Sequence, residues 1–520
     1  MTTCLWFKRD LRVEDHAPLL EAAARGPVLC LYIYEPEVLQ AHYTEASHLG
    51  FLNESLRELD ASLRQRGNRL ITRHGEAVEV FRALHRDVRF NRIYAHQETG
   101  PWHTFERDKR VATWARESGV EFREFQWNGV IRRLKNRDGW AAQWYKTMAA
   151  PVLPAPGAIS PPTVEVSSCG FLDNPVELDV TPTLKEAHRQ RGGRMAALHT
   201  LESFLGGRGR HYSRHLSSPV TAGESCSRLS AYLTFGVLSM REVYAATESE
   251  VKRLRGDSSA EARGFARSLS SFAGRLRWHC HFIQKLEQQP ELEWRNIMPL
   301  ADGLREGEWS PERFQAWCAG QTGYPLVDAT MRALHHTGWI NFRMRAMLVS
   351  FASYHLWLDW RKTSHYLARH FLDFEPGIHY SQFQMQSGTT GINTLRMYNP
   401  TKQVEDHDPQ GVFIRRWVPE LEGVPPEWIA EPWRMTNGDQ QRYGCLIGSQ
   451  YPAPIVDHKT AIGYARSRFA TLRHHEAFNE QADQIQKKLG SRRTPGQNNS
   501  PKKRPTPKPV QGDMFDEAEG

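Results

Sequence analysis

The chain has 520 residues, of which 67 are Lys or Arg and 59 are Asp or Glu, so its formal charge is +8. With 40% hydrophobic and 24% charged residues, the composition predicts a globular protein with several cores and excludes a wholly disordered chain. No apolar run reaches the roughly 18 residues of a membrane span, and charges within the first twelve positions exclude a signal peptide. We expect a cytoplasmic protein with no membrane partner. The seven Cys form no CxxC pair, which agrees with a reducing compartment.

The first 135 residues predict an α/β domain. Four short apolar runs, typical of buried strands, alternate with four segments that carry apolar residues at helical spacing. We expect the strands at residues 5–7, 28–33, 69–71 and 92–95, and the helices at 17–24, 47–65, 77–84 and 102–118. This alternation predicts a Rossmann-like, doubly wound parallel sheet. No GxGxxG motif follows the first strand, so the usual dinucleotide-binding loop is absent.

The remainder divides into three parts. Residues 136–195 predict an interdomain linker, because much of this stretch is rich in Pro, Gly and Ser. Residues 196–485 show almost wholly helical periodicity, which predicts an all-α domain. Residues 486–520 hold eight Lys or Arg against four acids, a net charge of +4, with few large apolar side chains, so we expect a disordered basic tail. Within the helical domain we expect helices at 198–204, 237–246, 265–286, 325–336, 343–358 and 459–472.

Small polar residues precede a predicted helix near Tyr232. The stretch 226–230 holds Cys226, Ser227 and Ser230. Backbone N–H groups at a helix start bind phosphate, so this segment is a candidate phosphate site. A plain N-cap explains the same residues, and spacing alone favours it.

Basic and aromatic residues share one predicted helix around Trp278. Arg275 and His279 flank this indole, and aromatic stacking combined with positive charge suits an unpaired nucleic-acid strand. His279 and His281 are two residues apart and point to different helix faces, so we expect no metal site.

Arg343 and Arg345 are also two residues apart and cannot share a helix face. At least one of them should point inward, where it needs a carboxylate or an anionic ligand. The acids nearby in a loop are Asp373 and Glu375. A structural salt bridge is the alternative that these residues alone favour.

Several motifs, taken in order, resemble those of the DNA photolyase and cryptochrome flavoproteins. They are LWFKRDLRVEDH at 5–16, CSRLS at 226–230 with GVLS at 236–239, TGYPLVDATMR at 322–332 with TGW at 337–339, YNPT at 398–401, FIRRWVPEL at 413–421 and YPAPIVDHK at 451–459. The resemblance covers residues 2–475 and leaves out only the tail. Cys226 stands where Thr is usual in the family's flavin-phosphate segment.

The resemblance implies a deoxyribodipyrimidine photolyase, an enzyme that splits cyclobutane pyrimidine dimers in DNA with an electron from excited, fully reduced FAD. It implies a monomer whose partner is DNA containing such dimers. It also implies room for a second, antenna chromophore in the α/β domain, whose identity the sequence does not specify.

The same resemblance implies a role for each matched residue. Arg345 and Asp373 would form an ion pair beside the reactive edge of the flavin, and Trp278 would stack on the flipped dimer. The implied FAD contacts are Tyr212, Cys226, Ser227, Arg228, Leu229, Ser230, Phe272, His279, Arg345, Asp373 and Glu375. The implied DNA contacts are Arg275, Trp278, Phe342, Arg343 and Met385, and the implied catalytic group is Trp278, Arg275, Arg345 and Asp373.

The chain departs from the family pattern around the substrate. Arg275 stands where photolyases carry Glu, His279 where they carry Arg, and Cys280 where they carry an acid. The usual His-Asn after Trp339 has become Asn341-Phe342, which moves the side-chain amide by one place. The missing His pair argues against repair of (6-4) photoproducts.

The acidic loop after residue 372 also differs. This loop aligns with the family pattern in more than one register, the registers differing by one residue. Either Asp373 or Glu375 therefore matches the second acid beside the flavin. In the family's three-Trp relay, Trp317 and Trp360 match the distal and middle steps, but the step next to the flavin falls on Ser381. The candidates to replace that step are Tyr380, His379, Trp339 or another aromatic residue.

These departures leave an alternative from another class. The altered substrate contacts and the interrupted relay favour a cryptochrome-like blue-light receptor, which binds FAD without repair activity. The retained Trp278 favours a divergent photolyase. A third hypothesis, a light-independent nucleic-acid binder, requires a protein without flavin.

Overall fold

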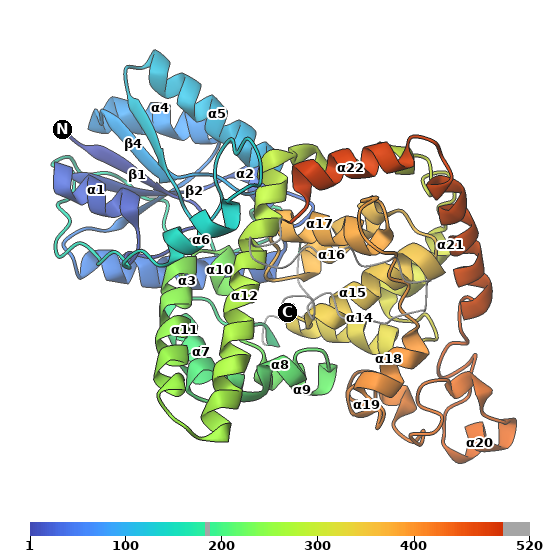
Figure 1. Cartoon of the computed structure of the whole chain (residues 1–520). Helices are drawn as coiled ribbons and strands as arrows, with labels where there is room; N and C mark the ends of the chain where they lie inside the picture. Colours follow the sequence, from blue (N-terminus) through green and yellow to red (C-terminus); the bar gives the residue numbers. More distant parts are fainter. Residues whose placement is uncertain (182–187, 492–520) are drawn as a thin grey trace.

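A computed structural model describes residues 1–181 and 188–491 as an α/β domain followed by a helical domain (Figure 1). The blue sheet and its helices lie at the upper left of Figure 1, and the green-to-red helices fill the rest. The predicted fold class is therefore confirmed. No helix within these described ranges is long and apolar enough to cross a membrane.

The α/β domain is built on one parallel five-stranded sheet with the order β3-β2-β1-β4-β5. Its strands are β1 (Thr3–Phe7), β2 (Val28–Tyr34), β3 (Leu70–His74), β4 (Arg92–His96) and β5 (Glu121–Phe125). The strand order reverses between β1 and β4. In open α/β sheets, the carboxyl ends of the strands at such a switch point form the usual ligand crevice.

Helices cover both faces of the sheet. Because successive strand residues point to opposite faces, Leu5 packs with α1 (Ala17–Arg25) and α3 (Ala46–Arg64), whereas Trp6 packs against the other face. Three further helices of this domain are α2 (Pro36–Leu39), α4 (Ala77–Val88) and α5 (Trp102–Glu117), of which α4 and α5 cover the Trp6 face. The core beneath α1 and α3 continues into the helical domain. The two domains therefore share one hydrophobic core.

In the first 150 residues the sequence prediction missed the short helix α2, strand β5 and helix α6. Strand β5 lies at the sheet edge, where its charged residues stay exposed and no apolar run marks it. Helix α6 (Trp140–Met148) falls inside the predicted linker. It buries Trp140, Trp144 and Met148 at a helical spacing that the following Pro-rich stretch concealed.

The Pro-rich segment follows the surface of the α/β domain. The backbone N–H of Val28 donates to the carbonyl of Ser160 at 2.8 Å, and that of Ile159 donates to the carbonyl of Arg66 at 2.8 Å. Further along, the N–H of Ala46 donates to the carbonyl of Thr181 at 2.8 Å. Linker residues 182–187 lie outside the described ranges.

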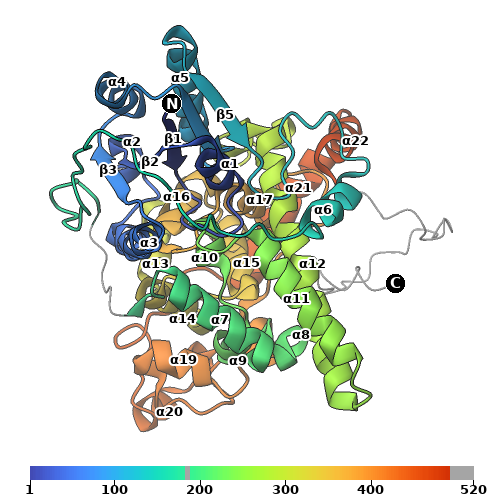
Figure 2. The same ribbon diagram turned by 90° about the vertical axis from the view of Figure 1, so that its left-hand side faces the viewer.

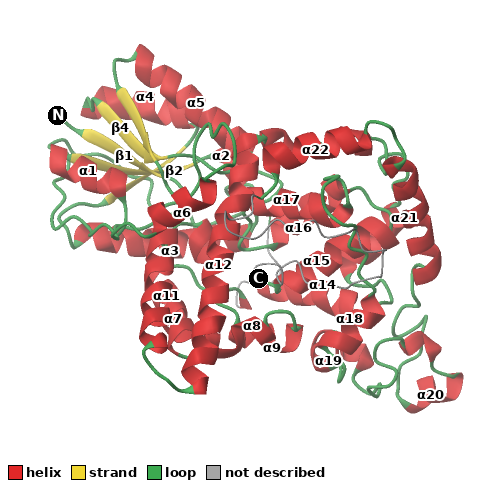
Figure 3. Cartoon of the chain, viewed as in Figure 1, coloured by secondary structure: helices red, strands yellow, loops and turns green. Residues whose placement is uncertain are grey.

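The second domain is helical, and Figure 3 shows that the strands of the described chain lie in the first domain. Helix α12, 29 residues long, forms its spine and packs against α11 and α17 (Figure 2). The helices are α7 (Arg194–Gly206), α8 (Tyr212–His215), α9 (Pro219–Ser225), α10 (Ser230–Thr234), α11 (Met240–Arg255), α12 (Ala260–Gln288), α13 (Pro311–Ala319), α14 (Pro325–Thr337), α15 (Phe342–Ser350), α16 (Trp360–His370), α17 (Pro376–Ser387), α18 (Pro400–His407), α19 (Val412–Trp417), α20 (Asn437–Arg442), α21 (His458–Arg473) and α22 (Phe478–Leu489).

Two predicted boundaries need correction. The helix expected at 343–358 ends as α15 at Ser350 and continues as a wider π-helical turn over Phe351–His355. Residues 486–489, expected in the tail, belong to α22, because Leu489 is buried in the helical core. Tail residues 492–520 lie outside the described ranges.

The N-terminal loop (residues 8–16) inserts into the helical domain. The backbone N–H of Leu11 donates to the carbonyl of Phe235 at 3.3 Å, and Nη1 of Arg12 donates to the carbonyl of Gly236 at 2.9 Å. Gly236 has φ of +62°, and a Cβ there would lie 2.0 Å from the carbonyl oxygen of Arg9. A side chain at this position would therefore push the domains apart.

We expect Gly236→Ala to lower the free energy of unfolding by about 2 kcal/mol or more, because backbone strain and a clash with backbone act together. Chemical denaturation of the purified protein measures the change. The matched control is Gly264→Ala on α12, where a Cβ meets no atom within 4 Å. This control should gain about 0.5–1 kcal/mol from helix propensity. Equal stabilities of the two variants would contradict the tight domain contact.

Candidate functional site

Arg9 of the N-terminal loop crosses to the helical domain. Its Nε donates to the carbonyl of Thr234 at 3.1 Å, and its guanidinium forms an ion pair with Glu375. Glu375 is 3% exposed, and burial raises its pKa although Arg9 opposes the shift. Sequence reasoning missed Arg9, because a charged residue in a predicted loop gives no sign that it is buried against another domain.

Asp10 anchors the same loop to the sheet. Its carboxylate accepts from Nδ1 of His96 at 2.6 Å and from Nε2 of His16 at 3.0 Å. Nδ1 of His16 accepts from the backbone N–H of Leu19 at 3.1 Å, so the ring proton sits on Nε2. Burial opposes ionisation of Asp10, but its bonds to the two His hold the pKa well below its ordinary value. These three residues have ligand atoms close enough to hold a metal ion, yet the hydrogen bonds by themselves account for the arrangement.

Arg345 and Asp373 form the ion pair that the resemblance implies. Nη2 of Arg345 donates to both carboxylate oxygens at 2.9 and 2.8 Å, and its Nε donates to the carbonyl of Ile340 at 3.0 Å. Burial alone would raise the pKa of Asp373, but Arg345, Ser230 and Arg228 together lower it. Arg343 instead lies 5.9 Å from the ring of Tyr398, so the two Arg diverge as their spacing predicts.

Arg228 lies near this pair. It has φ of +60°, an unusual backbone conformation for a side chain of this size. Its guanidinium carbon lies 4.0 Å from the ring centre of Trp339, and its buried Nε has no hydrogen-bond partner in the described part of the chain. Burial lowers the pKa of Arg228, although nearby Asp373 opposes this shift.

Arg208 holds the backbone of the segment 226–230 in place through hydrogen bonds. The guanidinium of Arg208 donates to the carbonyls of Glu224 at 2.8 Å, Cys226 at 2.7 Å and Ser227 at 3.2 Å. Helix α10 begins only at Ser230, and the residue before it, Leu229, supplies no side-chain cap. The plain N-cap that spacing alone favours is therefore not found at the start of α10, although the backbone N–H of Leu229 donates to the Ser227 hydroxyl at 3.5 Å within the loop. Burial raises the pKa of the Cys226 thiol to about 12, so it stays a neutral thiol.

One face of α12 carries Phe272, Arg275 and His279, which follow one another at helical spacing. The ring of Phe272 meets that of Tyr212 edge to face at 5.8 Å, and Arg275 lies against the Tyr212 hydroxyl. Burial raises the pKa of Tyr212 to about 12. Burial and nearby Arg9 lower the pKa of His279 to about 4, and its buried Nδ1 has no hydrogen-bond partner within residues 1–181 and 188–491.

Trp278 lies next to this face and is half-buried. Its ring centre is 4.9 Å from that of His281 and 6.0 Å from that of Phe282. His281 faces Arg137, whose Nη2 donates to its carbonyl at 3.2 Å, so His279 and His281 diverge as predicted. The other expected substrate residues, Phe342 and Met385, lie on α15 and α17, and α17 packs against both α12 and α15.

The three positions matched to the electron relay differ sharply in environment. Trp317 is fully buried, with ring centres of Phe314 and Tyr366 at 6.3 and 5.9 Å. Ser381 is also fully buried, and its hydroxyl has no hydrogen-bond partner among the residues described. A Ser side chain offers no accessible redox state, so the step beside the flavin needs another residue.

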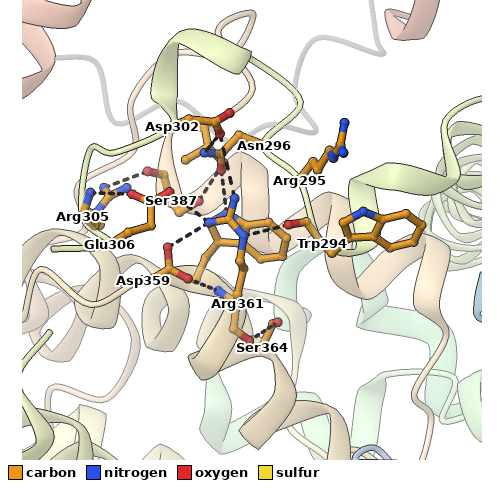
Figure 4. A network of polar contacts seen from close by, with 12 residues as sticks. Trp294, Arg295, Asn296, Asp302, Arg305, Glu306, Asp359, Arg361, Ser364 and Ser387 are labelled. Atoms are coloured by element: carbon orange, nitrogen blue, oxygen red, sulfur yellow. Dashed lines mark hydrogen bonds and ion pairs between the residues drawn. The ribbon is translucent and has the colours of Figure 1, made fainter.

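Trp360 belongs to the polar network of Figure 4. Its indole N–H donates to the side-chain oxygen of Asn296 at 2.7 Å. The Asn296 amide donates in turn to Asp302 at 2.7 Å (Figure 4). The guanidinium carbon of Arg361 lies 5.0 Å from the Trp360 ring centre. Arg361 forms an ion pair with Asp359 at 2.9 Å, so the Trp360 ring lies beside charged side chains.

Two family models match the chain. The FAD binding domain of DNA photolyase matches residues 272–471, and DNA photolyase matches residues 3–152. The deoxyribodipyrimidine photo-lyase of Streptomyces griseus is 30% identical over 488 residues, which cover 90% of this chain and 98% of that protein. Cryptochrome DASH of Gloeobacter violaceus is 29% identical over 507 residues, which cover 91% of this chain and 97% of that protein. The crystal structure of a bacterial class III photolyase from Agrobacterium tumefaciens matches with a TM-score of 0.79 at 27% identity, covering 91% and 98% of the two chains.

The ion pair between Arg9 and Glu375 generates a prediction about stability. Arg9→Met should lower the free energy of unfolding by about 2–3 kcal/mol, because it leaves a buried carboxylate without its partner. Glu375→Gln in the same chain should recover part of that loss. Denaturant titrations of the wild type, both single variants and the double variant form a cycle, and strictly additive changes would contradict a direct interaction.

The ionisation of Asp373 should make the free energy of unfolding depend on pH. Its pKa is lowered in the folded chain, so its contribution to stability is complete above its unfolded pKa of about 3.9 and is lost as the pH falls through the lower, folded value. At pH 7 we expect Asp373→Asn to lose about 3 kcal/mol, since Arg345 loses its counter-charge. Denaturation at several pH values should show the wild type approaching the variant only below pH of about 4. A difference that stays constant into that acidic range would contradict the assignment.

Proposed function

Because the chain belongs to the DNA photolyase and cryptochrome family, we propose that it repairs cyclobutane pyrimidine dimers in DNA, using light and fully reduced FAD. One observation carries the proposal: α12 keeps the half-buried Trp278 beside Arg275 and His279. An aromatic surface for a flipped base thus lies one helical turn or less from the face that meets Tyr212. A protein that only sensed light would not need this surface.

The side chains at the expected flavin site suit such a cofactor. Nε of Arg228 and Nδ1 of His279 are buried and have no hydrogen-bond partner among the described residues. Burying a polar atom without a partner costs free energy, so a polar ligand would stabilise both groups. Tyr212 and Phe272 add aromatic walls, and Arg208 fixes the loop at 226–230. When bound and fully reduced, FAD supplies one electron on excitation by light.

The protein's own residues have three tasks in this reaction. Arg345, oriented by Asp373 and by the carbonyl of Ile340, holds a fixed positive charge where the resemblance puts the flavin edge. Trp278 receives a dimer flipped from the duplex, which costs little because a damaged base pair stacks poorly. Asp373, Glu375 and Ser381 are buried, so water has little access to the side chains around the expected flavin site. A second chromophore in the α/β domain stays a prediction.

The receptor hypothesis rests on a different observation. The relay position nearest the flavin is Ser381, and both cryptochromes and photolyases cover nearly the whole chain at about the same identity. A cryptochrome-like receptor would bind FAD and lack repair. It would therefore share the site of Arg345 and Asp373 but make no use of Trp278 as a stacking surface.

The deciding experiment uses ultraviolet-irradiated oligo(dT) and the full-length protein with chemically reduced FAD. Under blue light we expect the thymine absorbance to recover. Trp278→Ala should weaken binding of the irradiated oligonucleotide by about 10- to 100-fold, since stacking contributes about 1–3 kcal/mol per base. Trp294→Ala removes a different exposed indole and serves as the matched control. No recovery with intact reduced flavin would favour the receptor, and no flavin at all would favour a light-independent binder.

A further inference from the structure

Tyr380 lies one residue before Ser381 on α17 and meets a residue of the other domain. Its hydroxyl is 3.1 Å from Nε2 of His42, which lies in the loop after α2. Tyr380 is 1% exposed, so its phenol has little access to water. Oxidising a buried tyrosine requires that its proton leave, because the oxidised phenol is a strong acid and a buried charge is costly. A base at hydrogen-bond distance meets that requirement.

Aromatic contacts connect Tyr380 with the ion pair at the expected flavin edge. The guanidinium carbon of Arg345 lies 4.0 Å from the ring centre of Phe371. The ring centres of Phe371 and His379 are 6.1 Å apart, and those of His379 and Tyr380 are 5.3 Å apart. Tyr380 is therefore a packed neighbour of the flavin-side residues, although its hydroxyl points toward the α/β domain.

His42 is poised to accept a proton and to pass it on. It faces Tyr380, Tyr43, His103, His365 and Arg369, and partial desolvation of its ring together with the positive neighbours lowers its pKa to about 4. Its imidazole is thus neutral before the reaction, which leaves a lone pair for the phenolic proton. Part of the His42 side chain is exposed, so a proton that it accepts can pass directly to water.

Trp360, one of the two relay residues that the family resemblance keeps, is bonded to no comparable base among the described residues. Its indole N–H donates to the amide oxygen of Asn296, and an amide oxygen is not a base at neutral pH. An oxidised Trp360 would keep its proton and its positive charge. Oxidation of Tyr380 can therefore be coupled to proton transfer, whereas oxidation of Trp360 cannot.

We propose that Tyr380 supplies, one at a time, the two electrons that return oxidised FAD to its fully reduced form, and that its phenolic proton moves to His42 each time. The inference rests on the proposed FAD chemistry. In each step one electron leaves the phenol for the flavin, the O–H bond of Tyr380 breaks, and an N–H bond forms at Nε2 of His42. The added proton leaves the exposed His42 for water. Full reduction takes two electrons, so the step occurs twice, and the flavin takes its own proton from solvent. A dissolved thiol then donates an electron, a proton returns from solvent, and the phenol is restored.

The test uses the full-length protein loaded with oxidised FAD and illuminated with blue light in the presence of a thiol. Electron paramagnetic resonance should detect a tyrosyl radical in the wild type, and its formation should be slower in D2O. Tyr380→Phe should abolish this signal. His42→Phe should slow its formation by about a hundredfold, the lower range of what a positioned base contributes.

The matched control is His335→Phe, which removes a comparable bond of 2.8 Å between Nε2 of His335 and the Tyr366 hydroxyl. It should leave the radical signal unchanged. A full signal in Tyr380→Phe, no isotope effect in the wild type, or loss of photoreduction in Trp360→Phe with an intact Tyr380 would overturn the proposal. Chemically reduced wild-type protein bypasses this step, so failure of dimer repair there counts against the proposed function and not against Tyr380.

Discussion

The carboxylate of Glu375 sits inside the helical domain, and the cation that neutralises it comes from the α/β domain. Burying a carboxylate without a partner costs several kcal/mol, so the helical domain cannot form this part of its site alone. Arg9 supplies the charge because the N-terminal loop enters the helical domain, where Gly236 leaves room for the Arg9 backbone. The shared hydrophobic core and this ion pair make the two domains one working unit.

Helix α12 carries the expected cofactor and DNA contacts on different sides of its axis. Phe272, Arg275 and His279 line the face near Tyr212, whereas His281 faces Trp140 of α6 and Arg137, and Trp278 packs against His281. A long, regular helix fixes these directions more firmly than a loop can. The proposed cofactor and DNA surfaces are therefore coupled by a single rigid element, and the altered residues Arg275 and His279 keep their places on it.

The acids and bases beside the expected flavin divide into charged and neutral groups. Arg345 holds Asp373 ionised, while desolvation favours the neutral forms of His279, His379 and His42. A site with two fixed ion pairs among neutral imidazoles can hold a charged cofactor and still accept a proton. The loss of a Trp at position 381 is then compatible with an active relay, because Tyr380 lies in the same helix with its own base.

The sequence by itself determined the order of strands and helices in outline, the two-domain architecture and the family, because apolar periodicity and long motifs are local properties of the chain. It also predicted that Arg343 and Arg345 diverge. It missed α2, β5 and α6, whose signals were short, weak or masked, and spacing alone favoured a helix cap at 226–230 that the structure does not show. Only the tertiary structure decided which charges are buried and what pairs with them. Arg9 with Glu375, Arg208 with the carbonyls of 224–227 and His42 with Tyr380 join residues far apart in sequence, and no spacing along the chain records such contacts.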